Sequence, residues 1–101
     1  MAIKILIPEI VRDDLKLIGQ YVGQGGHARS LEWLEYMQQR IRMLADHPRL
    51  GPKYDNTYRK LQARSFWILY RIDAEDDPTE VTLVRIIHHK QEIQAAIKAP
   101  K

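Results

Sequence analysis

The chain has 101 residues, of which 45% are hydrophobic and 29% charged, a balance typical of one globular domain with a single modest core. It has no cysteine, which excludes disulfides, thiolate metal sites and thiol nucleophiles. The net charge of +3 favours an acidic partner, and no apolar run is long enough to span a bilayer. Residues 1 to 8 hold one lysine and no apolar stretch of signal-peptide length, so we expect a cytoplasmic single domain, residues 1 to 101, without membrane contact.

The first half of the chain predicts a strand followed by a helical hairpin. Residues 3 to 7 are apolar and rich in β-branched side chains, so we expect a short strand that Pro8 ends. Apolar residues recur at helical spacing over residues 9 to 24 and again over residues 27 to 46, separated by the glycines of 23 to 26. Two amphipathic helices joined by a short loop form an antiparallel pair, whose shared apolar face the rest of the chain must cover.

Three further strands are predicted after the second helix. That helix ends between residues 44 and 51, because Pro48 cannot continue it and Gly51 marks a turn. The period of the pattern then changes, which predicts strands over residues 58 to 63, 66 to 73 and 80 to 88 and a short helix over 91 to 98. We therefore predict an α+β fold of order β-α-α-β-β-β, with the helical hairpin packed on a small, mostly antiparallel sheet and a short C-terminal helix.

The last predicted strand indicates where the layers lie. Strict alternation puts its side chains on two faces, and both sets are largely apolar. The sets are Val81, Leu83, Arg85 and Ile87 on one face and Thr82, Val84, Ile86 and His88 on the other. A strand that is apolar on both faces is central in its sheet, with helices on one side and another layer on the other.

Charge is unevenly distributed over the second half of the chain. Residues 73 to 80 are acidic, which we interpret as a solvated hairpin tip. Arg85 lies within an apolar strand, where it either pairs with a helix carboxylate, from Asp14 or Glu35, or contacts a target. Residues 53 to 71 carry a basic run, which consists of Lys53, Arg59, Lys60, Arg64 and Arg71.

Several aromatic and histidine side chains have a structural and a functional interpretation. Trp33 and Met37 stand at helical spacing, which is typical of core residues or of contacts with a partner protein. Trp67 is expected to be half buried, although an aromatic ring beside arginines can also stack on a base. His88 and His89 are adjacent on a strand and are expected to point to opposite faces, so we predict no metal site.

The order and spacing of these features resemble the RelE/ParE superfamily of small toxins from bacterial type II toxin–antitoxin pairs. The first half is similar to the family's helical hairpin at Asp14, Leu15, Ile18, Tyr21 and Ala28. In the second half the matching residues are Leu44, Pro48, Gly51, Arg59, Leu61, Ile68, Tyr70, Arg71, Val81, Leu83, Arg85 and His88. The resemblance extends over almost the whole chain and implies a cognate antitoxin as partner and no cofactor.

Within the superfamily the chain looks most like the ParE branch, whose members poison DNA gyrase by binding it. The hairpin of residues 9 to 46 has the length of the ParE hairpin, and Arg85 and His88 match an Arg-x-x-His pattern. The chain departs from that branch at residues 89 to 92, which read His-Lys-Gln-Glu where a glycine and, two residues on, an arginine are usual.

Two alternatives remain open from the sequence. One is the RelE branch, which cuts mRNA at the ribosome without a metal, using cations to stabilise the phosphorane and a base and an acid to move protons. Against it, the nuclease branch carries an arginine four residues before Tyr70, where this chain has Phe66, and no tyrosine follows Tyr70. The other is a homologue without toxicity that acts with its antitoxin as a DNA-binding corepressor. If the chain is a nuclease, the candidate catalytic residues are Arg59, Arg64, Arg85 and His88.

The resemblance implies two binding surfaces. An antitoxin would lay an amphipathic helix in the groove of the hairpin or add a strand to the sheet edge. The expected antitoxin contacts are Leu31, Trp33, Leu34, Met37, Ile93 and Ile97. The expected target contacts on the sheet and the C-terminal segment are Arg59, Lys60, Arg64, Trp67, Arg85, His88, His89 and Lys90.

Overall fold

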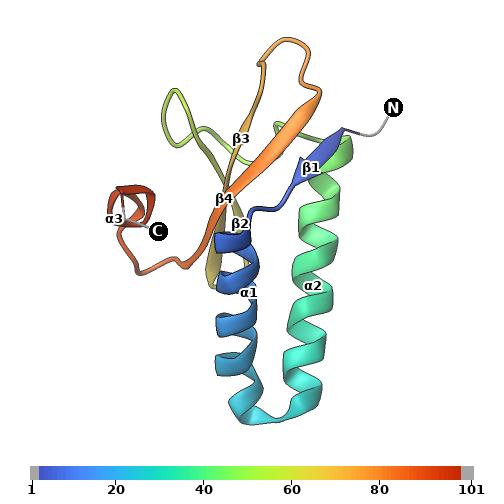
Figure 1. Cartoon of the computed structure of the whole chain (residues 1–101), viewed down its shortest axis with the longest axis vertical. Helices are drawn as coiled ribbons and strands as arrows, with labels where there is room; N and C mark the ends of the chain where they lie inside the picture. Colours follow the sequence, from blue (N-terminus) through green and yellow to red (C-terminus); the bar gives the residue numbers. More distant parts are fainter. Residues whose placement is uncertain (1–2, 99–101) are drawn as a thin grey trace.

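The protein folds as a helical hairpin on one face of a four-stranded sheet, with a short helix on the opposite face (Figure 1). This computed structural model describes residues 3 to 98. No helix in that part of the chain is both long and apolar enough to cross a membrane. In chain order the elements are β1 (Lys4–Leu6), α1 (Glu9–Val22), the 3-10 turn η1 (Gly23–Gly25), α2 (His27–Asp46), β2 (Arg59–Ala63), β3 (Phe66–Ile72), β4 (Glu80–His88) and α3 (Ile93–Lys98). The predicted α+β fold and element order are confirmed.

The sheet has the strand order β1-β4-β3-β2. β1 runs parallel to β4, whereas the β2–β3 and β3–β4 pairs are antiparallel, so the sheet is mostly antiparallel as expected. β4 is flanked on both sides, which agrees with its two apolar faces. β1 pairs only with Glu80 to Thr82, so the rest of β4 has no strand on that side.

A bulge in β4 overturns the predicted strict alternation of that strand. Tyr70 pairs with Leu83 but Leu69 pairs with Arg85, so β4 has one extra residue, Val84, at this point. An extra residue shifts the pleat and redirects the side chains after it. Ile86 therefore faces the same core as Leu83, and Arg85 is turned toward the edge of the strand, where α1 lies.

Two apolar cores hold the layers together. The main core lies between the hairpin and the sheet and includes the fully buried side chains of Val11, Met37, Leu44, Ile68 and Leu83. A smaller core forms where α3 covers the other face, and contains Leu69, Ile87 and Ile93 with Trp67 and Val84 packed around them. The half-buried position predicted for Trp67 is confirmed.

The short C-terminal helix begins two residues later than predicted. β4 is followed by a turn in which the Gln91 amide donates to the His88 carbonyl and the His88 amide donates to the Gln91 side chain, at 2.9 and 2.8 Å. These bonds use residues that the sequence pattern had assigned to the helix, so α3 starts at Ile93.

The β3–β4 hairpin closes around the carboxylate of Asp73. Its Oδ1 accepts from the backbone amides of Thr79 and Glu80, at 2.9 and 3.0 Å, and its Oδ2 accepts from the Thr79 hydroxyl at 2.6 Å. Because these bonds favour the ionised form, first of all the one from the Thr79 side chain, they lower the pKa of Asp73 to about 2.

We expect the hairpin tip to loosen as the pH falls through about 2. A carboxylate whose pKa is lowered in the folded state stabilises the fold above its unfolded pKa, about 3.9, and loses that contribution as it takes up a proton. NMR titration of the Thr79 and Glu80 amides should give a midpoint near 2, and Asp73→Ala should abolish the transition. A midpoint near 4 would contradict the role given to these hydrogen bonds.

Candidate functional site

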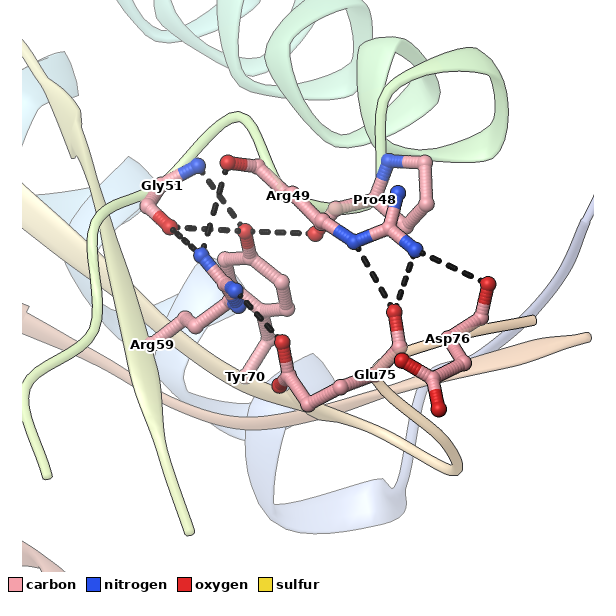
Figure 2. A network of polar contacts seen from close by, with 7 residues as sticks. All are labelled: Pro48, Arg49, Gly51, Arg59, Tyr70, Glu75 and Asp76. Atoms are coloured by element: carbon pink, nitrogen blue, oxygen red, sulfur yellow. Dashed lines mark hydrogen bonds and ion pairs between the residues drawn. The ribbon is translucent and has the colours of Figure 1, made fainter. Parts of the chain in front are cut away.

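Arg59, expected among the target contacts on the sheet, is buried beneath the loop that follows α2. Its Nη1 donates to the Gly51 carbonyl and its Nη2 to Glu75 Oε1, both at 2.8 Å (Figure 2). The buried Tyr70 hydroxyl donates to the Pro48 carbonyl at 2.8 Å and accepts from the Gly51 amide at 2.9 Å. Burial raises the pKa of Tyr70, so this hydroxyl stays protonated as a donor. These hydrogen bonds fix the conformation of the loop between α2 and β2. The four residues that make them, Pro48, Gly51, Arg59 and Tyr70, are called the loop lock below.

Gly51 is required in this lock because two neighbours approach it closely. A Cβ atom at this position would lie 2.8 Å from the Lys60 carbonyl oxygen and 2.9 Å from Tyr70 Cε1. The Lys60 oxygen belongs to the backbone of β2, which cannot move aside without disturbing the sheet. The glycine that marked a turn in the sequence is thus fixed by the close approach of another strand.

The acidic hairpin tip is exposed, as expected, but it is also fastened to the α2–β2 loop. Arg49 Nε donates to the Glu75 carbonyl at 3.0 Å and its Nη2 to the Asp76 carbonyl at 3.2 Å (Figure 2). Arg59, which bonds the Glu75 side chain, lowers the pKa of that carboxyl group. The Glu75 carboxylate therefore neutralises Arg59 of β2, while Arg49 of the loop is bound by backbone carbonyls of the hairpin tip.

Arg64 occupies the tight turn between β2 and β3 and is held there by α2. Its φ of 56° lies in the left-handed region, which is unfavourable for a residue other than glycine. Its guanidinium bonds both oxygens of Glu32, at 2.9 and 2.5 Å, and its Cζ lies 4.1 Å from the centre of the Tyr36 ring. The hydrogen bond from Arg64 lowers the pKa of Glu32. This cation is engaged with the hairpin.

Arg85 pairs with Asp14, one of the two partners considered from the sequence. Its Nε lies 2.8 Å from Asp14 Oδ2 and its Nη2 3.0 Å from Oδ1, and this pairing raises the pKa of Arg85. The same carboxylate accepts from the Ile86 amide at 3.0 Å, at the edge of β4 that β1 leaves open. Arg85 Nη1 also reaches the Ala96 carbonyl of α3, at 3.4 Å. The role of Arg85 in the fold is to join three elements.

The two histidines do not point to opposite faces, so that prediction is wrong. β4 ends at His88, and the rings of His88 and His89 stack with their centroids 4.7 Å apart. His88 Nδ1 accepts from the Lys90 amide at 3.1 Å, while His89 Nδ1 lies 2.9 Å from the Ser65 carbonyl. Among residues 3 to 98, no three His, Cys, Asp or Glu side chains come together as metal ligands.

The predicted catalytic set is thus divided among different parts of the structure. Arg59 belongs to the loop lock, Arg64 to α2 and Arg85 to α1, each beside its own carboxylate. His88 packs against Phe66, with ring centroids 5.4 Å apart, and Phe66 packs in turn on Trp33. Each of the three arginines is paired with a different carboxylate, and the pair of Arg64 with Glu32 is exposed to solvent.

The residues expected to contact an antitoxin lie in different parts of the structure, some buried in the two cores and some at the surface. Trp33 and Met37 are buried in the main core, because the apolar stripe of α2 faces the sheet, so they offer no surface to a partner. Ile93 and Ile97 pack on the smaller core. Of the six, Leu31 is the most exposed, at 49%, and Leu34 is partly buried.

Two surface grooves include residues that were not among the expected binding residues. One, of about 370 Å³, lies between α1 and the ends of β3 and β4 and includes Leu17 and Tyr21, which are 64% and 69% exposed. The other, of about 370 Å³, lies between α1 and α2, with an apolar floor that includes Leu15 and with Arg12 and Arg42 at its rim. Leu17 and Tyr21 are one turn apart and lie outside the core stripe of α1, which is the signal that could have revealed them.

The chain matches a known protein family and several solved structures. A family model described as "ParE toxin of type II toxin-antitoxin system, parDE" matches residues 5–93. A comparison with curated proteins found no match.

Several solved structures have the same fold. The "Chromosomal ParDE TA system from P. aeruginosa" aligns with a TM-score of 0.73 at 16% identity, covering 86% of this chain and 96% of that one. A mutant of the E. coli toxin RelE in the free state aligns with a TM-score of 0.60 at 15% identity, over 89% and 86%. The RelBE2 toxin–antitoxin complex from Mycobacterium tuberculosis gives 0.55 at 21% identity, over 87% and 99%. At these identities the likeness concerns the fold.

We expect Gly51→Ala to lower the free energy of unfolding by about 1 to 3 kcal/mol, because the added methyl group overlaps backbone that cannot yield. Urea denaturation measures this change. Gly19→Ala is the matched control, since its Cβ would be 3.6 Å from its nearest neighbours and alanine is the better helix former. Equal losses in the two variants would contradict the packing argument.

We expect Asp14→Ala to destabilise the protein by about 2 to 4 kcal/mol, because it leaves the Arg85 guanidinium and the Ile86 amide without their acceptor. The double change Asp14→Leu with Arg85→Met should recover most of that loss. Glu32→Ala breaks the exposed pair with Arg64 and should cost no more than about 1 kcal/mol. Thermal and urea unfolding of the wild type and these three variants measures the losses in stability. Similar losses from Asp14→Ala and Glu32→Ala would contradict a structural role for the buried pair.

Proposed function

This chain belongs to the ParE toxin family of type II toxin–antitoxin systems, and we propose that it acts in the cytoplasm by binding DNA gyrase, without cutting RNA. A cognate antitoxin encoded beside it would neutralise it. The proposal extends the family assignment to a molecular target and to a mode of action.

The observation that carries the proposal is that the three arginines of the candidate catalytic set are each paired with a carboxylate. Phosphoryl transfer without a metal needs cations that face the transferring phosphate and groups that move protons. Arg59, Arg64 and Arg85 instead bond to carboxylates from three different elements. A toxin that acts by binding alone needs no such constellation, so this arrangement supports the ParE mode of action.

Phe66 also supports a toxin that binds its target without cutting RNA. It stands where the RelE-like nucleases carry an arginine, and it is buried between Trp33 and His88. An apolar ring at this position supplies no positive charge to a phosphate. The packing of Phe66 therefore supports a structural role for this end of the sheet and not a catalytic one.

For the antitoxin, the edges and grooves favour a docked helix over an added strand. The open edge of β2 is already partly covered, because Arg40 donates to the Gln62 carbonyl at 2.6 Å and the Lys60 amide donates to the Pro52 carbonyl at 3.1 Å. The groove between α1 and α2 is open, with an apolar floor and two arginines at its rim. An amphipathic helix with acidic flanks fits that surface by shape and by charge.

Induction of the chain alone in bacteria, with pulse labelling of new DNA and new protein, tests the proposed target. We expect DNA synthesis to fall first, and purified gyrase to lose supercoiling activity when the protein is added. Co-induction of the small open reading frame next to the gene should restore growth. A fall in protein synthesis before DNA synthesis would indicate a ribosome-dependent nuclease, and harmless expression would favour the corepressor hypothesis; either result overturns the proposal.

A further inference from the structure

Two cations of the middle strands remain uncompensated. No carboxylate of residues 3 to 98 lies within 4.0 Å of Lys60 or Arg71. We infer that Lys60 and Arg71, together with Tyr54 and Trp67, form a docking surface for an acidic segment of the protein that this toxin targets. The inference rests on the proposed function in assuming that the target is a protein, and the four residues are called the Lys60 surface below.

The strand register places both cations on one face of the sheet. Lys60 pairs with Leu69, and directly paired residues of antiparallel strands point to the same face. Leu69 belongs to the smaller core beneath α3, and Arg71 stands two residues further along β3. Diagonal neighbours of this kind are about 7 to 8 Å apart. The Lys60 surface therefore lies on the face away from the helical hairpin, next to α3.

Aromatic rings hold Lys60 in position. Its Nζ lies 4.4 Å from the centre of the Trp67 ring and 5.8 Å from that of Tyr54. Tyr54 is itself fixed, because its hydroxyl accepts from Gln94 of α3 at 3.0 Å. A lysine that is already ordered loses less conformational entropy when a partner binds, so its charge contributes more to affinity.

The acidic residues closest in sequence are used elsewhere and do not neutralise this face. Asp55 accepts from the amides of Thr57 and Tyr58, both at 2.8 Å. Glu75 bonds Arg59, and Asp73 closes the β3–β4 hairpin. The Lys60 surface thus keeps its positive charge, while the other strand arginines do not.

The chemistry of the surface fits a protein better than a nucleic acid. Nucleic-acid sites use rows of cations along the phosphates and free aromatic faces on which bases stack. Here two cations stand out, Lys60 already lies over the Trp67 ring, and that ring also packs against the smaller core. Partly exposed Trp, Tyr and Arg side chains around a small charged centre are typical of binding hot spots in protein interfaces. An acidic protein segment is the partner that matches both features.

The experiment compares Lys60→Glu with Arg71→Glu, as one double variant, against the matched control Lys16→Glu with Arg29→Glu. The control makes the same change in charge at exposed positions of the hairpin. We expect the Lys60 surface variant to bind purified DNA gyrase at least about tenfold more weakly, with a flatter dependence on salt, and to lose growth arrest. The control should behave as the wild type, and thermal unfolding checks that both remain folded.

The outcomes separate this inference from the proposed function. Growth arrest and gyrase binding equal to the wild type in the Lys60 surface variant would overturn the inference. If the wild type fails to bind gyrase but the Lys60 surface variant alone loses growth arrest, the proposed target is wrong and the surface stands. If the wild type binds single-stranded RNA or DNA oligonucleotides and the variant does not, the assignment to an acidic protein is overturned. Arg71→Glu alone, at an exposed position, carries the test if the double variant unfolds.

Discussion

The carboxylate of Asp14 stands where the helical hairpin, the sheet and the last helix meet. One oxygen accepts from the backbone of β4 at the edge that β1 does not reach, and both oxygens bind Arg85. Arg85 then extends to the carbonyl of Ala96 in α3. A buried carboxylate requires partners of this kind, because its desolvation is costly without them. The position of the hairpin on the sheet is therefore set by one charged group as well as by apolar packing.

The Asp14 carboxylate also neutralises the charge of Arg85, as Glu75 and Glu32 do for Arg59 and Arg64. A family of this kind includes binding toxins and nucleases on one fold, so the fold by itself does not separate them. Our proposal of a binding toxin rests on whether the strand cations are paired with carboxylates within the chain. In this chain Arg59 and Arg85, which match the superfamily pattern, are paired with carboxylates, whereas Arg71, which also matches it, and Lys60 have no carboxylate within 4.0 Å among residues 3 to 98.

Much of the fold could be predicted because hydrophobic periodicity is a local property of the chain. The bounds of α2 and β4 agree with the sequence pattern, and those of the other elements differ by one to a few residues at ends where turns compete for the same backbone groups. The pairing of Arg85 with a helix carboxylate was one of two alternatives that local reasoning left open, since a cation within an apolar strand needs a partner. The bulge at Val84 did not, because it depends on the register between two strands.

By itself, the sequence determined the class of fold, the order of its elements and the superfamily, since these depend on periodicity, on turn residues and on the spacing of a few polar side chains. Only the tertiary structure decided which of those polar side chains are free. Arg59 is buried by a loop that Gly51 and Tyr70 hold, Arg64 is held by Glu32, and His88 and His89 stack after the strand has ended. The partners of a charged group come from distant parts of the chain, and a pattern along one segment contains no information about them.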